Sequence, residues 1–116
     1  MITLYGIPNC DTVKKARAWM GEHGVAHDFH DFKKLGVPAA HLDAWIVQLG
    51  WEKLVNRKGT MWRRLDVASQ EAVKDAASAK ALMLAQPSVI KRPVVEWGAG
   101  TTVGFEPGAW ALLSRR

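Results

Sequence analysis

Cys10 is the residue of this chain whose type and setting most clearly indicate chemistry, and it is the only cysteine among 116 residues. An apolar run at residues 2–5 breaks at residues 6–9, and a helical pattern starts directly after the cysteine. A thiol at such a strand-to-helix junction meets the unpaired N–H groups of the first helical turn, which favour the reactive thiolate. The position therefore predicts a nucleophilic thiol, although an isolated cysteine is more often a small buried hydrophobe.

The residues around Cys10 favour the reactive interpretation. The flanking segment is polar, and Lys14 adds a positive charge within the next turn. Nearby cations are a recognised cause of a lowered thiol pKa. Asn9 and Asp11 are both expected to cap the helix, and the negative charge of Asp11 opposes ionisation of the neighbouring thiol.

The charge and apolar patterns exclude several classes of protein. Lysine and arginine number 16 against 11 acidic residues, a formal charge of +5, but the basic residues form scattered pairs. Scattered pairs indicate solvated faces or a small anionic substrate, and nucleic acid is not an expected partner. A lone cysteine forms no internal disulfide, and there is neither a leader-like start nor an apolar run of about 20 residues. We therefore expect a cytoplasmic protein with no membrane association.

The apolar periodicity predicts an α/β chain. Strands over 2–5 and 25–32, joined by a helix over 11–23, form a βαβ unit with parallel strands. Helical spacing continues from Pro38 to Gly50, a loop and a short helix follow over 51–65, and two short helices fit 69–86, with Ser69 and Ser78 as N-caps. A hairpin over 94–105 and a helix over 107–113 complete the order. A four-stranded mixed sheet flanked by helices is the expected result, with Cys10 at the carboxyl end of the first strand.

Three histidines are the candidate metal ligands of this sequence. His23, His27 and His30 are close in sequence, but Gly24 separates the first from the strand that carries the others. No second cysteine joins them, and their spacing matches no established zinc motif. We expect no metal site.

Three blocks of sequence resemble the arsenate reductase (ArsC), Spx and YffB family, most closely its YffB branch. They are YGIPNCDTVKKA at 5–16, LVNRKG at 54–59 and IKRPVV at 90–95. The similarity runs over essentially the whole chain. It implies one thioredoxin-like domain over residues 1–116, with a helical insertion at about 38–86.

The resemblance also implies a chemistry. Cys10 is the expected nucleophile, glutathione the expected co-substrate, and glutaredoxin a candidate partner, with no bound cofactor. Pro93 is expected to be a cis-proline that faces the thiol. Arginine suits the binding of an oxyanion or a glutathione carboxylate, because its planar group offers a fork of donors and stays charged. The residues carried over as substrate- or glutathione-binding are Arg57, Arg92, Pro93, Lys14 and Asn9.

Two positions depart from the subgroups of the family. Glu106 stands where glutathione-coupled arsenate reductases carry a third arginine, and a carboxylate repels arsenate. Val13 stands where Spx proteins carry a second cysteine, so an internal redox switch cannot form. The expected function is a glutathione-dependent thiol reductase acting on an oxidised or anionic substrate. The alternatives are a noncatalytic, Spx-like redox-sensing module that binds RNA polymerase, and an arsenate reductase proper.

Overall fold

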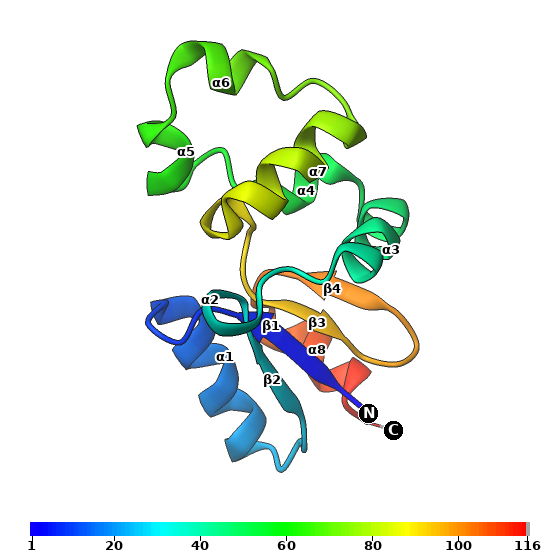
Figure 1. Ribbon diagram of the computed structural model, residues 1–116. Helices are drawn as coiled ribbons and strands as arrows, with labels where there is room; N and C mark the ends of the chain where they lie inside the picture. The colour runs from blue at the N-terminus through cyan, green and yellow to red at the C-terminus, as the bar shows by residue number, and fades with distance from the viewer. Residues whose placement is uncertain (116) are drawn as a thin grey trace. The chain divides into compact units, whose positions relative to one another are not determined.

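The structure is a computed structural model that describes residues 1–115. The chain divides into two compact units, and Figure 1 follows its elements in sequence order. The first unit is Met1–Leu35 together with the chain from Arg92 onward, and the second is Gly36–Lys91. The predicted insertion, residues 38–86, lies within the second unit.

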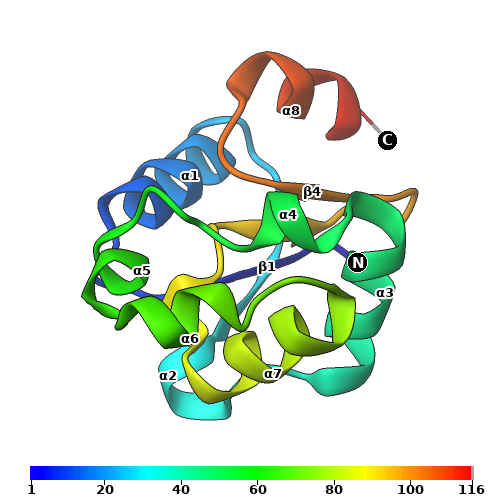
Figure 2. The same cartoon turned by 90° about the horizontal axis from the view of Figure 1, so that it is seen from above.

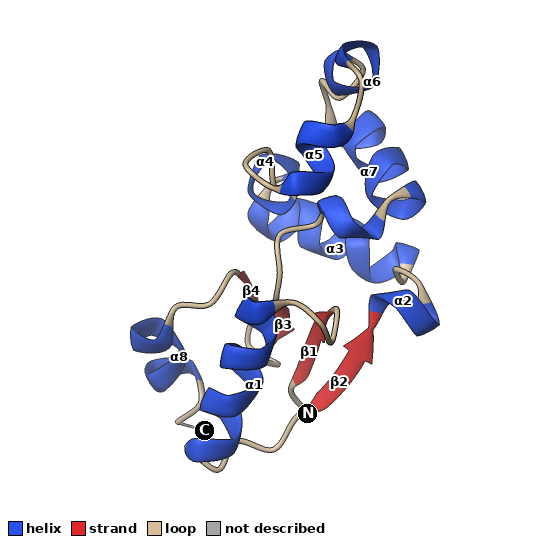
Figure 3. Cartoon of the chain, turned by 90° about the vertical axis from the view of Figure 1, so that its left-hand side faces the viewer, coloured by secondary structure: helices blue, strands red, loops and turns tan. Residues whose placement is uncertain are grey.

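A four-stranded mixed sheet forms the centre of the first unit (Figure 3). Its strands are β1 (Thr3–Gly6), β2 (Asp28–Asp31), β3 (Val94–Glu96) and β4 (Thr101–Val103), in the spatial order β2-β1-β3-β4. β1 is parallel to β2 and antiparallel to β3, which pairs antiparallel with β4. The predicted α/β class and mixed sheet are confirmed.

β2 is shorter than the predicted strand over 25–32 because both of its ends are fixed by local hydrogen bonds. At its start, α1 (Asp11–Glu22) ends in a Schellman motif: Gly24 has φ +64, and the Val25 N–H donates to the Met20 carbonyl at 2.8 Å. At its end, the Asp31 carboxylate accepts a hydrogen bond from the Lys33 N–H at 2.8 Å. That bond favours the start of a helix over further extension, and α2 (Phe32–Leu35) follows.

α1 and α8 (Pro107–Leu113) cover the same face of the sheet (Figure 2). Trp110 is fully buried, and its ring meets those of Phe105, Trp97 and Trp19 edge-on, with centroids 4.9, 5.2 and 5.7 Å apart. Edge-to-face contacts of this kind add to the free energy gained from burial. The buried cluster comprises Leu4, Val13, Ala16, Trp19, Met20, Val95, Trp97 and Trp110.

The second unit is helical, as the sequence predicts. Its elements are α3 (Ala39–Leu49), α4 (Trp51–Leu54), α5 (Thr60–Arg64), α6 (Val67–Glu71), α7 (Ala76–Ala85) and the 3₁₀ turn η1 (Pro87–Val89). Gly50, with φ +86, ends α3 and lets α4 begin at the next residue. Lys80 of α7 and Asp43 of α3 form an ion pair at 2.8 Å. Along the described chain, no helix combines the length and apolar character needed to span a bilayer.

The predicted caps of α6 and α7 are wrong by three residues. Asp66 and Asp75 are the N-caps, and Ser69 and Ser78 lie inside the first turn at N3. Each aspartate accepts a hydrogen bond from the N–H of the serine three positions on, at 3.2 and 2.8 Å. The Ser78 hydroxyl in turn accepts from the Asp75 N–H at 3.1 Å, which completes a capping box. A carboxylate is as good a cap as a hydroxyl, so residue type alone did not distinguish the two frames.

Trp110→Ala is expected to lower the free energy of unfolding by about 3–5 kcal/mol, because it leaves a large cavity. Trp110 is the buried residue through which α8 joins the core. The measurement is urea unfolding followed by far-UV circular dichroism. Leu112→Ala is the matched control on the same helix: Leu112 is 66% exposed, and its loss should change stability by about 0.5 kcal/mol or less. Equal effects of the two substitutions would contradict the assignment of Trp110 as the anchor of α8.

Candidate active site

Cys10 is itself the N-cap residue of α1, which corrects the expectation that Asn9 or Asp11 caps the helix. Its N–H donates to the Ile7 carbonyl at 3.2 Å, and its carbonyl accepts from the Lys14 N–H at 2.9 Å. Asn9 lies exposed in the turn before it, and Asp11 is the first helical residue. No side-chain oxygen caps the helix, so the N–H groups of its first turn remain available to the sulfur.

A close contact fixes the distance between the end of β1 and the start of α1. A Cβ atom on Gly6 would lie 2.8 Å from Cγ2 of Val13, closer than two such carbons approach. Gly6 therefore allows the fully buried Val13 side chain to pack directly against the end of β1. The helix begins close enough to the strand that the turn carrying Cys10 is short and well determined.

The electrostatic surroundings of Cys10 favour the thiolate. Burial of the half-exposed sulfur opposes ionisation, but four contributions of opposite sign outweigh it. These are the backbone N–H of Val13, the hydrogen bond and the positive charge of the Arg92 guanidinium, and the backbone N–H of Thr12. The pKa of the Cys10 thiol is consequently lower than its ordinary value.

Arg92 and Pro93 precede β3, and the peptide bond between them is cis, as expected. Pro93 is buried, and its carbonyl accepts a hydrogen bond from the Gly104 N–H at 2.9 Å. Gly104, with φ +87, lies just beyond β4, so the far end of the hairpin supports the segment that carries Arg92. The first unit thus brings Cys10 and Arg92 together.

The other predicted site residues lie in different settings. Lys14 is exposed on α1, one turn beyond the cysteine. Arg57 belongs to the second unit, where it is exposed with its guanidinium carbon 5.1 Å from the centroid of the Trp51 ring. Glu106 is exposed at the N-cap of α8.

The three histidines have separate structural contacts. The His23 ring nitrogen Nδ1 bonds to the Trp19 carbonyl at 2.9 Å, and its ring stacks on Trp19 at 4.0 Å. His27 contacts the Val25 carbonyl at 3.2 Å, and the His30 ring lies 4.9 Å from that of Tyr5. Among residues 1–115, no group of three or more metal-ligating side chains is brought together.

One polar pair, Tyr5 and Glu96, was not predicted from the sequence. The Tyr5 hydroxyl donates to Glu96 Oε1 at 2.6 Å, and burial together with this carboxylate raises the pKa of the tyrosine. Tyr5 is opposite Val94 in the β1–β3 ladder, so Glu96 is its diagonal neighbour. The alternation of both strands would have identified the pair if their register had been known.

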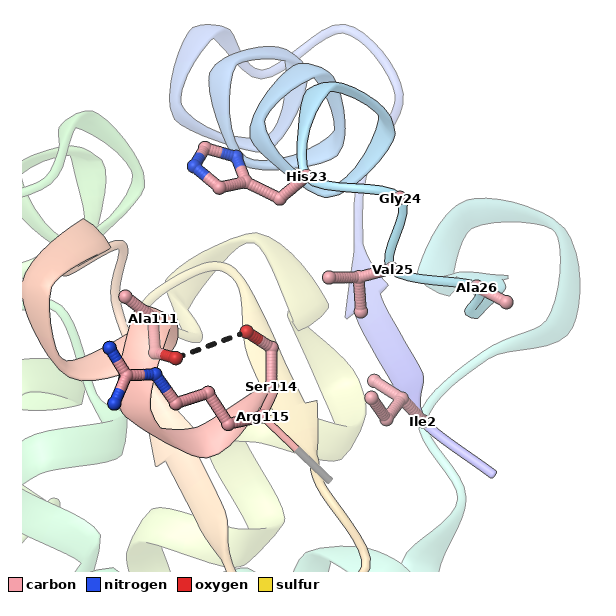
Figure 4. Close-up of a pocket in the computed structure, with 8 residues that line it drawn as sticks. All are labelled: Ile2, His23, Gly24, Val25, Ala26, Ala111, Ser114 and Arg115. Carbon is pink, nitrogen blue, oxygen red and sulfur yellow. Dashed lines mark hydrogen bonds between the residues drawn. The ribbon is translucent and has the colours of Figure 1, made fainter.

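A pocket of about 590 Å³ lies elsewhere in the first unit, and it contains none of the predicted site residues. Figure 4 shows that it is formed where α1, the start of β1 and the end of α8 meet. Both helices present their carboxyl-terminal ends at this point, so their dipoles oppose the binding of an anion. Its lining residues are Ile2, His23, Gly24, Val25, Ala26, Ala111, Ser114 and Arg115.

Known proteins of similar sequence have the same fold as this chain. The YffB (PA3664) protein is 53% identical over 98% of this chain and 99% of its own, with a TM-score of 0.93. An arsenate reductase (ArsC) related protein from Brucella melitensis is 48% identical over 99% of this chain and 95% of its own, with a TM-score of 0.75. The global transcriptional regulator Spx of Streptococcus pyogenes is 28% identical over 99% of this chain and 87% of its own. The family model described as "ArsC family" matches residues 5–112, and the chain therefore belongs to the ArsC family.

Proposed function

We propose that this protein is a glutathione-dependent thiol reductase with Cys10 as its nucleophile. The observation that supports the proposal most directly is the lowered pKa of the thiol at the start of α1, beside Arg92. A thiolate is the form of cysteine that attacks sulfur. Membership of the ArsC family and similarity to arsenate reductase-related structures support reductase chemistry of this kind.

The proposed reaction balances with one protein thiol. The Cys10 thiolate attacks the glutathionyl sulfur of a mixed disulfide, the substrate S–S bond breaks, and a Cys10–glutathione disulfide forms. The released substrate thiolate takes a proton from water. A glutathione thiolate then attacks the glutathionyl sulfur of this intermediate, which gives oxidised glutathione and restores the Cys10 thiolate. The substrate is reduced and glutathione is oxidised; glutaredoxin is a candidate partner for the second step.

The remaining residues receive roles that the family resemblance implies and that suit their chemistry. Arg92 stabilises the thiolate, both when it attacks and when it leaves. The backbone before Pro93 pairs with the bound glutathionyl peptide, and Asn9 offers a hydrogen bond beside the sulfur. Lys14 adds positive charge. Arg57 lies in the second unit, and its role as a binder of a glutathione carboxylate stays an expectation from the family resemblance. We propose the cytoplasm as the compartment, because its glutathione pool supplies the reductant.

A second candidate function rests on the similarity to Spx over 99% of the chain. In this alternative the protein is a noncatalytic module that docks on RNA polymerase, and Cys10 only senses oxidation by forming sulfenic acid or a glutathione adduct. Reduction of arsenate is the third candidate. The exposed carboxylate of Glu106 weighs against it, because the corresponding arginine of arsenate reductases would attract the oxyanion.

The rate of Cys10 alkylation by iodoacetamide, measured against pH, should show a midpoint below the ordinary thiol value of about 8.5. Arg92→Gln should raise the midpoint, since it removes both a hydrogen bond and a positive charge from the sulfur. Lys91→Gln is the matched control, because it removes an exposed positive charge one residue away. The signal is unambiguous because the chain has no other thiol. A midpoint at or above about 8.5 in the folded wild-type protein would contradict an activated thiolate.

Cys10→Ser should reduce the turnover of a glutathionylated peptide by glutathione to the uncatalysed rate, because a hydroxyl does not replace a thiolate in disulfide exchange. The assay follows the formation of oxidised glutathione, and Ser114→Ala serves as the control for loss of a small polar side chain elsewhere. Absence of wild-type turnover, with RNA polymerase binding that survives Cys10→Ser, would favour the Spx-like alternative. Oxidation of glutathione that depends on arsenate would favour the third candidate.

A further inference from the structure

Gly104 and Pro93 face each other where the β3–β4 hairpin continues past its strands. The register places Val94 opposite Val103, so the next pair outward is Pro93 with Gly104. In a hydrogen-bonded antiparallel pair the two residues exchange two backbone bonds. Proline has no N–H to donate, so the bond from the Gly104 N–H to the Pro93 carbonyl, at 2.9 Å, is the single one that this pair can form. The anchor of Pro93 on the hairpin thus depends on one N–H group.

The backbone of Gly104 has a conformation that glycine adopts more freely than any other residue. Its φ is +87, in the left-handed region, where a Cβ atom adds strain, and the residue is buried. This conformation ends the extended strand directly after the N–H that bonds to Pro93. The next residue, Phe105, packs on Trp110 with ring centroids 4.9 Å apart. Gly104 is therefore held from two sides, by the sheet through its N–H and by the core through its neighbour.

Arg92 is the residue that this anchor places. It directly precedes Pro93, is half-buried, and forms a hydrogen bond from its guanidinium to the Cys10 sulfur. The peptide group between Arg92 and Pro93 is planar and the proline ring fixes φ, so ψ is the one soft backbone dihedral between that group and the anchored carbonyl. Hydrogen bonds weaken steeply as their angle departs from linear. A displacement of the Pro93 carbonyl therefore reaches the contact between the guanidinium and the sulfur.

We propose that Gly104 is a positioning residue, which holds the Arg92 guanidinium against the Cys10 sulfur by anchoring the Pro93 carbonyl. The inference deepens the proposed function and rests on it, since it takes Cys10 as the nucleophile and Arg92 as the group that stabilises the thiolate. All four residues belong to the first unit. Gly104 acts through Pro93 and Arg92 and touches neither the sulfur nor the substrate in this account.

Gly104→Ala tests the role through the pH dependence of Cys10 alkylation. The added Cβ strains a backbone at φ +87 and displaces the N–H from the Pro93 carbonyl, which should raise the alkylation midpoint by about half a pH unit. A rise of that size lowers the thiolate fraction about 3-fold at pH values well below the midpoint, and alkylation slows accordingly. In the Arg92→Gln background the same substitution should cause no further rise, because its action passes through the arginine.

Gly98→Ala is the matched control in the same hairpin. Gly98 also has a positive φ, +93, and a Cβ atom there would meet open space, so the substitution adds the same kind of backbone strain. It lies between β3 and β4, at the end of the hairpin opposite to Pro93. Both variants should unfold at lower urea concentrations than wild type, but Gly98→Ala should keep the wild-type alkylation midpoint.

A measurement on the unmodified chain covers the case in which Gly104→Ala does not fold. In amide correlation spectra recorded by NMR against pH, the Gly104 resonance should shift with the midpoint found by alkylation. The reason is that ionisation of Cys10 changes the pull on Arg92, and so on the Pro93 carbonyl to which the Gly104 N–H is bonded. The Gly98 amide should not follow that midpoint. In Cys10→Ser the transition at Gly104 should disappear, whereas the titrations of the histidines should remain.

The outcomes separate this inference from the proposed function. The positioning role is overturned, and the reductase proposal stands, if Gly104→Ala folds and keeps the wild-type midpoint or raises it equally without Arg92. An equal rise in Gly98→Ala, or a Gly104 amide that ignores the ionisation of Cys10, overturns it as well. If the wild-type midpoint is not lowered, the activated thiolate fails, and the role of Gly104 fails with it. If the midpoints behave as expected but wild type does not turn over a glutathionylated peptide, the glutathione proposal fails and the positioning role stands.

Discussion

The contact between Gly6 and Val13 is the constraint on which the site depends. Because no Cβ stands between them, Val13 packs against the end of β1, and α1 begins within a few residues of the strand. Val13 serves two purposes, since its side chain belongs to the core cluster and its N–H stabilises the Cys10 thiolate. Reactivity at the surface is thus coupled to packing in the interior.

The Cys10 thiolate is also stabilised by Arg92, a residue distant in sequence, and the pairing of the sheet strands brings the two together. β3 pairs antiparallel with β1, with Val94 opposite Tyr5. When this register is extended by two residues beyond the end of β1 and before the start of β3, it directs Arg92 toward the loop that leads from β1 to Cys10. The charge that stabilises the thiolate thus comes from a residue 82 positions away in sequence, carried there by strand pairing. A helix terminus alone supplies only part of the effect.

The sequence predicted what depends on local pattern and missed what depends on register or on competing local bonds. The βαβ start, the hairpin and α8 follow from periodicity, and glycine and proline mark their ends. The N-caps were misplaced because Asp66 and Asp75 precede serines of nearly equal capping strength. No compositional signal identifies Cys10 as the N-cap of α1, since cysteine is not a preferred cap. The Tyr5–Glu96 pair depends on a β1–β3 register that no single segment encodes. The pairing of Cys10 with Arg92 was accessible only through resemblance to a family.

A lowered thiol pKa also affects the stability of the fold and of any disulfide that Cys10 forms in the proposed reaction. Folding lowers the pKa of the Cys10 thiol, so its ionisation stabilises the fold at pH values above the unfolded-state pKa. That contribution is lost as the pH falls through the folded-state pKa. A mixed disulfide is uncharged at sulfur and loses the same interactions with Arg92 and the helix N–H groups. The fold therefore favours the free thiolate over its own adduct, and a sulfur of lowered pKa is the better leaving group. The chain has no second cysteine, so in the proposed reaction this bias would favour transfer of the disulfide bond to an external thiol.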